Sequence, residues 1–425
     1  MKILHINTAT SGGAATAAIR IHEGMVNQGL DSHFLSLRHA SVSIPNHHAY
    51  SGPVKTTKPD YPVLSFKNWL KEKIFRPYDK ALVFFNNQNN QKQKNRTPRI
   101  LNGFNSFSLF SYPESLYDIT QTKIYQEADV IHLHWVADFL DYSTFFKKNK
   151  KPIVWTMHDM NPIMGGFHYK NDLLDNLETH EIEDKRLEGI KIDAYSNTSS
   201  LTIVAPSKWL CKAAKESKAF KTREVLNIRY RIDRTIFRPR DKQFARSLFQ
   251  LPTTKKIFLL ASKDLNDSRK GIDLVLPIIE HKEMQDCIFL LAGSNFKGKS
   301  YPNVIALGGV HDELLMSLVY NASDYFILSS REDNLPNTML ESIACGTPII
   351  GFNIGDNQEI IGENNCGIIC DALTTDSLFI AIKSVLNDEI KFDSNLISEV
   401  AKALFSEEKV VQEYKTIYER IVLND

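Results

Sequence analysis

Two carboxylates lie eight positions apart in a stretch that predicts a strand, a loop and a helix. Asp333 lies in the loop after the apolar run 325–329, and Glu341 lies on the following helix. Asn334 is a suitable N-cap for that helix, and Pro336 suits its first turn because proline lacks an N–H. A carboxylate can accept hydrogen bonds from two adjacent hydroxyls. On spacing alone, the better explanation is the helix dipole, which favours acids here by about 0.3–1 kcal/mol each.

A basic turn follows a second predicted strand. The strand over 257–261 leads into a polar loop that ends in Lys270-Gly271, and a helix is predicted from Ile272. Glycine permits close approach of the backbone and lysine supplies a point charge, so the turn suits a diphosphate. For this dipeptide alone, an ordinary basic turn is the better interpretation.

The elements around these residues alternate as in an α/β fold. A strand over 2–7 leads through a turn containing Gly12-Gly13 into a helix, which is typical of a nucleotide-binding unit, although the glycine pair alone is a weak signal. His134 and His158 each follow a further predicted strand. Ligands gather at this end of parallel strands, but a lone histidine there is more often structural.

Length and composition limit the class of protein. With 425 residues the chain suits two domains, and the alternation restarts near residue 257, so the second domain begins near residue 236. Hydrophobic residues make up 43% and charged residues 24%, which indicates a soluble globular protein, and the net charge of +1 excludes no partner class. We expect neither a signal peptide nor a membrane span. Five scattered cysteines indicate a reducing, cytoplasmic compartment.

The combined motifs resemble glycosyltransferase family 4, and especially its exopolysaccharide and colanic-acid-type branch. The resemblance rests on Asn-Leu-Pro-Asn-Thr from residue 334, Ala-Cys-Gly-Thr-Pro from residue 344, His-Leu-His-Trp from residue 132 and Val-Trp-Thr-Met-His-Asp from residue 154. It covers nearly all of the chain outside 45–115. It implies a GT-B architecture, in which two Rossmann-like parallel-sheet domains face a cleft.

The resemblance also implies a division of labour between the domains. Residues 1–235 form the acceptor domain, with an insertion at about 52–112, and 406–425 cross back to it. Residues 236–405 form the domain that holds the nucleotide-sugar donor. In the family, the first acid of the pair binds sugar hydroxyls and the second binds the ribose.

Individual roles follow from matching positions. Asp333 replaces the family's first glutamate and is one methylene shorter, so Glu332 competes for the sugar contact, while Glu341 matches the ribose-binding acid. Lys270 matches a lysine that holds the diphosphate, and Lys263 or Arg269 supplies the second cation; Arg269 is favoured because a guanidinium grips two oxygens. The predicted catalytic residues are His158, Asp333 and Lys270. The predicted donor-binding residues are Gly12, Gly13, Lys263, Arg269, Lys270, Asn334, Leu335, Asn337 and Glu341.

The implied reaction is retaining transfer of a sugar from a nucleotide-diphosphate sugar to a hydroxyl of a glycan or lipid-linked acceptor, in surface polysaccharide biosynthesis, by an enzyme of the hexosyltransferase class. We expect no metal and no cofactor, because no Asp-x-Asp motif is present, and no nucleic-acid partner. One alternative is a non-catalytic protein of the same fold that binds nucleotide sugars or glycans. Another is a nucleotide-sugar epimerase of similar build.

Residues 52–112 interrupt the alternation with eleven Lys or Arg against three acids. Apolar and aromatic residues recur at roughly helical spacing from Leu64 to Tyr78, as in helices that lie on membranes. An insertion that packs its apolar side on the domain explains the pattern equally well. If the segment binds lipid, the protein works at the inner face of the membrane.

Binding through residues 60–99 predicts salt-sensitive attachment to anionic membranes. The protein should cosediment with anionic liposomes and detach as salt rises, because screening weakens the attraction of lysines to lipid headgroups. Vesicles of neutral lipid are the control. Equal recovery with neutral and anionic vesicles would contradict the membrane interpretation.

Overall fold

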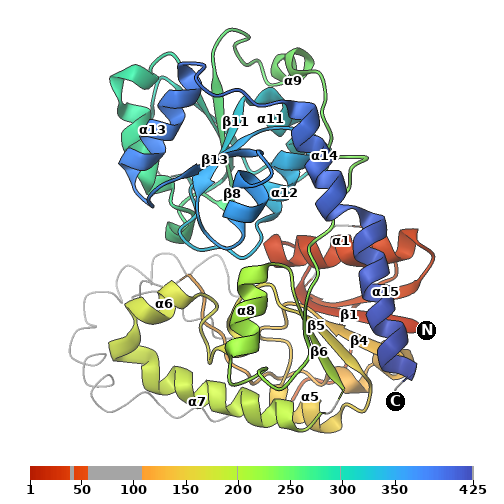
Figure 1. Ribbon diagram of the computed structural model, residues 1–425. Coiled ribbons are helices and arrows are strands. Elements are labelled where there is room, and N and C mark those ends of the chain that lie inside the picture. The colour runs from red at the N-terminus through yellow and green to blue at the C-terminus, as the bar shows by residue number, and fades with distance from the viewer. Residues whose placement is uncertain (39–42, 56–107, 199, 297, 424–425) are drawn as a thin grey trace, which may run out of the picture.

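The computed structural model describes residues 1–38, 43–55, 108–198, 200–296 and 298–423. The segment 60–99, for which membrane contact is predicted, lies outside these residues. Two parallel sheets with helices on their faces form two α/β domains, so the predicted fold class is confirmed (Figure 1).

The first sheet has seven parallel strands in the order β3-β2-β1-β4-β5-β6-β7. Its central strands are buried on both faces, which explains their nearly continuous apolar sequence. The strands are β1 (Lys2–Ala9), β2 (Asp31–Arg38), β3 (His47–Ala49), β4 (Val130–Leu133), β5 (Ile153–Thr156), β6 (Leu201–Ala205) and β7 (Val225–Asn227). Its helices are α1 (Gly13–Asn27), α4 (Lys123–Glu127), α5 (Tyr142–Lys148), α6 (Lys170–Asp175), α7 (Leu177–Ser196) and α8 (Lys208–Glu216).

The second sheet has six parallel strands in the order β10-β9-β8-β11-β12-β13. The strands are β8 (Ile257–Asp264), β9 (Ile288–Ser294), β10 (Val304–Gly308), β11 (Tyr325–Leu328), β12 (Ile349–Phe352) and β13 (Gly367–Cys370). The helices are α9 (Lys242–Leu248), α10 (Leu276–Glu280), α11 (Glu313–Ala322), α12 (Asn337–Ala344), α13 (Thr375–Leu386) and α14 (Ser394–Phe405). The predicted boundary near residue 236 falls in the connection between β7 and β8, and its position within that connection stays a prediction.

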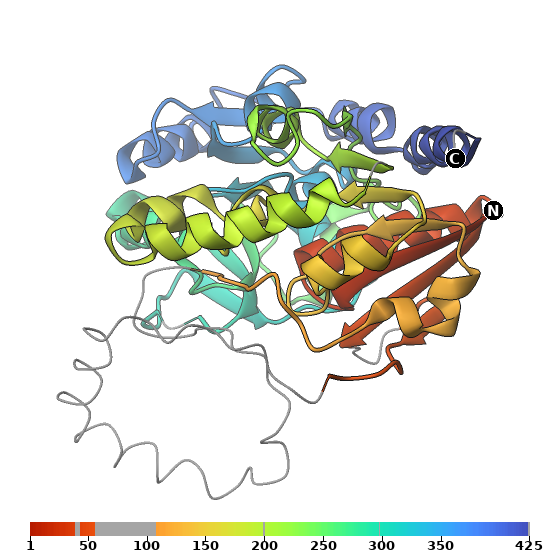
Figure 2. The same ribbon diagram turned by 90° about the horizontal axis from the view of Figure 1, so that it is seen from below.

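The last helix, α15 (Glu407–Leu423), lies along the first domain, and both ends of the chain are on the same side of that domain (Figures 1 and 2). Two tyrosines fix it to the sheet: the Tyr414 hydroxyl is 2.7 Å from the Thr156 hydroxyl, and the Tyr418 hydroxyl is 2.6 Å from His132 Nδ1. Apolar side chains of α15 share one buried cluster with residues of both domains. The C-terminal helix therefore joins the two halves through packing as well as covalently.

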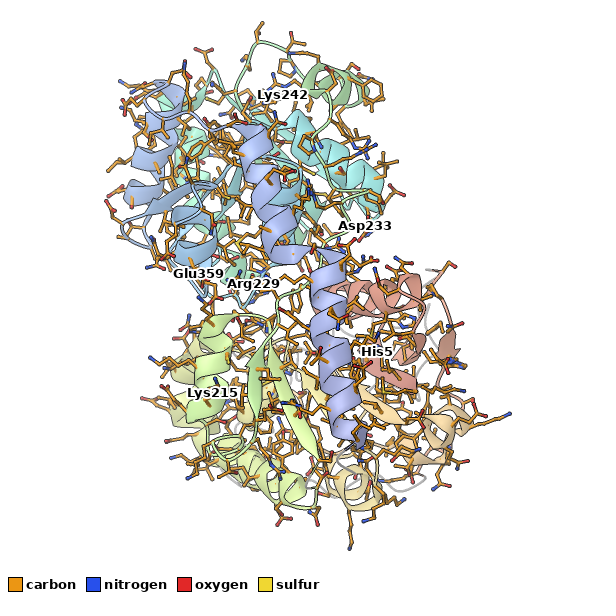
Figure 3. All side chains as sticks on the ribbon, turned by 45° about the vertical axis from the view of Figure 1, so that its right-hand side comes forward. His5, Lys215, Arg229, Asp233, Lys242 and Glu359 are labelled. Carbon is orange, nitrogen blue, oxygen red and sulfur yellow. The ribbon has the colours of Figure 1, made fainter. Side chains whose placement is uncertain are left out.

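Charged contacts also join the domains beside the connection. Arg229 and Glu359 lie together at the junction (Figure 3), and Arg229 Nη2 donates to Glu359 Oε1 at 2.6 Å. Lys208, at the start of α8, places its Nζ 2.8 Å from the same oxygen. Glu359 belongs to a π-helical turn, Gln358–Gly362, of the second domain. One carboxylate thus pairs with two cations that come from the first domain and the connection.

Two predicted helix starts are wrong. Helix α12 begins at Asn337, with Pro336 rather than Asn334 at the N-cap position. The Asn334 side chain instead bonds to groups of the first domain, and this tertiary contact outweighs its capping preference. No regular helix starts at Ile272: two 3-10 turns, 268–270 and 272–274, precede the short helix α10.

Candidate active site

Asp333 lies between two cations at the carboxyl end of β11. Its Oδ2 accepts from Lys270 Nζ at 2.5 Å and lies 3.3 Å from Arg269 Nη1. Burial alone would raise the pKa of Asp333, but the Lys270 and Arg269 charges outweigh that effect and hold the pKa below its usual value. Asp333 is therefore ionised at neutral pH, and the two predicted diphosphate ligands are paired with the predicted sugar ligand.

Arg269 also reaches the first domain. Its guanidinium carbon lies 4.3 Å from the centre of the Tyr169 ring, a cation–π contact across the interface. Its Nη1 donates to the Glu332 carbonyl at 2.9 Å. Lys263 lies elsewhere: its Nζ is 3.6 Å from the point where a Cβ on Gly12 would stand. Of the two candidates for the second cation, Arg269 is the one beside Lys270 and Asp333.

Gly271 is required by the backbone that places Lys270. Its φ is +65°, and a Cβ here would stand 2.1 Å from the Ser329 carbonyl oxygen. The glycine thus lets the basic turn pack against the end of β11. Its close approach is to protein backbone, and this packing brings Lys270 to Asp333.

Glu341 is held by a buried arginine of the first domain. Arg20, from α1, donates through Nη2 to Glu341 at 2.7 Å and to Glu313 at 2.6 Å. The Tyr320 hydroxyl donates to the other Glu341 oxygen at 3.0 Å. Arg20 is only 3% exposed, and its Nη1 has no hydrogen-bond partner among the described residues. The predicted ribose ligand is therefore oriented by a cation from the opposite domain.

Glu332 has a structural contact of its own. Its carboxylate accepts from the backbone N–H groups of Lys170 and Asn171, at 2.8 and 2.9 Å, and so caps α6. Asp356 does the same for α8, accepting from the N–H groups of Lys208 and Trp209 at 2.6 and 2.9 Å. Each acid belongs to the second domain and each helix to the first. These contacts favour Asp333 over Glu332 as the acid available to a sugar.

The remaining predicted donor-binding residues line the same interface. Asn334 accepts from the Ser207 hydroxyl at 2.5 Å and donates to the His158 carbonyl at 3.3 Å. Asn337 donates to the Gly13 carbonyl at 2.8 Å. Leu335 is 3% exposed and packs in the core that both domains share. The glycine turn of the first domain is thus brought against the first turn of α12.

His158, the predicted catalytic histidine, follows β5. Its Nε2 lies 3.0 Å from His134 Nδ1, and its Nδ1 lies 2.6 Å from the Tyr230 hydroxyl. Burial lowers the pKa of His158 to about 4, although the nearby Asp159 carboxylate opposes this. The imidazole is therefore neutral at pH 7, and both of its nitrogens have partners.

Sequence reasoning missed several residues that join the two domains around the site. Arg20 left one signal: it stands among Ala17, Ala18 and Ile21, on the face of α1 that is expected to be apolar. A charged residue at such a position needs a buried partner. Asp356 and Tyr230 left none, because their partners become neighbours only when the domains meet.

A known protein family matches most of the second domain. Residues 255–388 match the family described as "Glycosyl transferases group 1". The matched residues lie within the second domain. The matched region contains Lys270, Asp333 and Glu341, and these findings support a glycosyltransferase function for the chain.

Relatives of known name are distant. The N-acetyl-alpha-D-glucosaminyl L-malate synthase of Bacillus anthracis is 22% identical over 340 residues, which is 76% of this chain and 83% of that protein. An uncharacterized glycosyltransferase of Haemophilus influenzae is 22% identical over 161 residues, which is 35% of this chain and 46% of that protein.

Solved glycosyltransferases of GT-B type share the whole fold. The sucrose-phosphate synthase of Thermosynechococcus elongatus has a TM-score of 0.65 at 15% identity, with all of both chains covered. Anabaena HepE in complex with UDP has a TM-score of 0.63 at 13% identity, over 99% of this chain and 100% of that one. These structures support the GT-B fold, while the exopolysaccharide branch stays a prediction. No helix in the described part of the chain is long and apolar enough to span a bilayer.

The buried histidines predict loss of stability in mild acid. Burial lowers the pKa of His5, His132, His134, His22 and His158. Because the unfolded chain then binds protons that the folded chain does not, stability is complete above about pH 6.5 and falls below it. Each such histidine contributes about 1.4 kcal/mol per pH unit until its folded pKa is reached.

Tryptophan fluorescence in urea measures this loss in the first domain alone, because all four tryptophans precede residue 236. The urea midpoint should fall steeply between pH 7 and pH 5. A variant of the exposed His311, His311→Gln, should keep the same slope. A midpoint that stays constant over this range would contradict the assignment of neutral buried imidazoles.

Substitutions of Asp333 and Glu341 should cause different binding defects. Glu341→Ala should weaken binding of the nucleoside diphosphate about 10- to 100-fold, since a hydrogen bond to a charged group is worth about 1.5–3 kcal/mol. Asp333→Ala should leave diphosphate affinity at least as high as in the wild type, because it frees Lys270 and Arg269, while turnover falls.

Calorimetric titration with diphosphate and with donor, run beside a thermal melt, separates these effects from simple instability. Asp273→Ala is the matched control, because this exposed carboxylate pairs with Arg331 alone among the residues that the structure describes, and its loss should change neither quantity. Equal losses of diphosphate affinity in Asp333→Ala and Glu341→Ala would reverse the assignment, and Glu332 would then be the acid to test.

Proposed function

We propose that this chain is a retaining glycosyltransferase that moves a sugar from a nucleotide-diphosphate sugar to a hydroxyl. One observation carries the proposal: Lys270 and Arg269 converge on the half-buried Asp333 where the two domains face each other. The same surface holds Glu341. Two cations and two carboxylates at this spacing match the needs of a diphosphate, a sugar and a ribose.

The ion pairs suggest how a donor is accommodated. A diphosphate offers oxygens to Lys270 and Arg269, and it replaces Asp333 as their partner. Asp333 is then free to accept from sugar hydroxyls.

No side chain in the described part of the chain caps α12, and the Met339 N–H of its first turn donates to the Pro336 carbonyl at 3.0 Å. The N–H groups of Asn337 and Thr338 therefore remain for an anion. These groups stabilise the leaving diphosphate as its charge develops.

We propose that the acceptor is a glycan or a lipid-linked sugar in surface polysaccharide synthesis. This rests on the sequence resemblance to the exopolysaccharide branch. The Bacillus anthracis relative is named for a small acceptor, malate. Small hydroxy acids therefore belong in the same test. Retention of configuration also rests on the resemblance, and the anomeric configuration of the product decides it.

A panel of nucleotide sugars tests the proposed function. The full chain is incubated with each donor, with and without glycan, lipid-linked and hydroxy-acid acceptors, and the released diphosphate and the sugar products are measured. Transfer to an acceptor supports the proposal. Tight donor binding without release indicates the non-catalytic alternative, and an epimerised donor indicates an epimerase.

Metal independence is a separate expectation. Lys270, Arg269 and the first turn of α12 supply the positive groups that a diphosphate leaving group needs, so turnover should survive EDTA. Activity is compared before and after chelation, with magnesium or manganese added back. Complete loss in EDTA with recovery on addition of metal would refute this expectation.

A further inference from the structure

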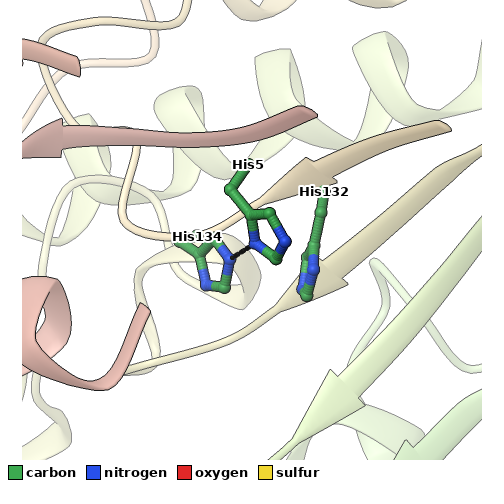
Figure 4. Close-up of side chains that lie close together, drawn as sticks. All are labelled: His5, His132 and His134. Carbon is green, nitrogen blue, oxygen red and sulfur yellow. Dashed lines mark hydrogen bonds between the residues drawn. The ribbon is translucent and has the colours of Figure 1, made fainter. Parts of the chain in front are cut away.

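A row of hydrogen-bonded side chains crosses the first sheet beneath the proposed site. His5 Nδ1 lies 2.8 Å from His134 Nε2, and His134 Nδ1 lies 3.0 Å from His158 Nε2 (Figure 4 shows the first pair). At one end, His5 Nε2 lies 3.2 Å from the Met25 sulfur. At the other end, His158 Nδ1 lies 2.6 Å from the Tyr230 hydroxyl. The row thus connects α1, β1, the ends of β4 and β5, and the interdomain connection.

The chemistry of imidazole restricts the direction in which the hydrogen bonds of this row run from donor to acceptor. A neutral imidazole has one N–H donor and one acceptor nitrogen. Burial lowers the pKa of His5, His134 and His158, so all three are neutral at pH 7. Each ring therefore donates to one neighbour and accepts from the other. Only two arrangements are allowed, and they run in opposite directions.

Met25 selects one of these two directions. A thioether sulfur accepts a hydrogen bond but has no proton to donate. His5 must therefore donate from Nε2, which leaves its Nδ1 to accept from His134 Nε2–H. By the same step, His134 Nδ1 accepts from His158 Nε2–H, and His158 Nδ1 accepts from the hydroxyl at the far end, that of Tyr230.

We propose that Met25, His5 and His134 are positioning residues that hold His158 as a neutral Nε2–H tautomer with both ring nitrogens engaged. His158 then has no free nitrogen with which to move a proton, and its ring is fixed in place beside the cleft. Because Met25 cannot accept a proton either, the row is closed at that end and is not a proton path. The proposal rests on the proposed function only in its consequence for turnover.

A metal site is the rival explanation for these histidines. Ligand atoms of His5, His132 and His134 all lie within 4.8 Å of one another. However, all six ring nitrogens already have hydrogen-bond partners; those of His132 are the Thr156 hydroxyl at 2.8 Å and the Tyr418 hydroxyl at 2.6 Å. A metal ion would have to break several of these bonds. The hydrogen-bonded row is therefore the better account.

Nitrogen NMR reads the tautomers directly. Protein labelled with ¹⁵N-histidine gives two-bond ¹H–¹⁵N correlations that separate protonated from bare ring nitrogens, and single His→Gln variants assign the signals. The expected result is a proton on Nε2 and a bare Nδ1 in His5, His134 and His158. A proton on Nδ1 of His158, or stoichiometric zinc in the purified protein by mass spectrometry, overturns the proposal.

Replacing the acceptor tests the part played by Met25. Met25→Leu keeps the volume but removes the acceptor, so Nδ1–H signals should appear in His5, His134 and His158. Met284→Leu, a buried methionine in the core of the second domain, is the matched control and should change none of them. Unchanged tautomers in Met25→Leu would show that the sulfur does not set the direction.

Kinetics adds a readout that a purely structural role would not move. In Met25→Leu we expect kcat to fall several-fold while affinity for the diphosphate stays the same, because Lys270 and Arg269 lie in the other domain. An unchanged kcat removes the positioning role. If no donor is turned over by any form of the protein, the proposed function fails, but the tautomer measurement still decides the hydrogen-bonded row.

Discussion

The ion pair between Asp333 and its two cations is the interaction on which the domain interface at the candidate site depends. A buried carboxylate is costly unless it is paired and hydrogen-bonded, and Lys270 and Arg269 supply both needs. Arg269 in turn packs on Tyr169 of the first domain. The charges of the donor side are therefore balanced within one domain but held in place by the other, so the site is complete only when the domains meet.

Elsewhere in the interface, charged groups of one domain are likewise held by groups of the other domain. Glu332 and Asp356 place carboxylates at the N-termini of α6 and α8, where unpaired N–H groups and the helix dipole favour an anion. Arg20 reaches the other way and binds Glu341. Acidic side chains of the second domain thus accept hydrogen bonds from N–H groups of the first domain at several separate points. This pattern fixes how the two faces align, and it leaves Asp333 as the acid whose partners a diphosphate can take over.

The sequence predicted what depends on local pattern. The two parallel sheets follow from apolar runs between glycine turns, and Lys270 and Asp333 were each placed after a strand of the second domain. The ion pair between them was not predicted, because both residues were assigned to parts of a donor. The helix starts at Asn334 and Ile272 failed because tertiary bonds at Asn334 and the tight packing of Gly271 outweighed local preference. Contacts such as Arg20 with Glu341 join residues 321 positions apart, and no pattern along the chain connects them.

The two domains stabilise the polar groups at their interface in different ways. The second domain keeps its groups charged and paired, so an incoming anion competes for Lys270 and Arg269 and exchange of partners is inexpensive. The first domain instead buries neutral imidazoles, and burial lowers the pKa of His134 and His158 so far that proton exchange at neutral pH is disfavoured. A neutral row with a fixed direction gives a rigid wall that neither attracts nor repels the diphosphate. On the proposed function, Lys270 and Arg269 of the second domain recognise the charge of the diphosphate, and the first domain contributes the neutral row of imidazoles.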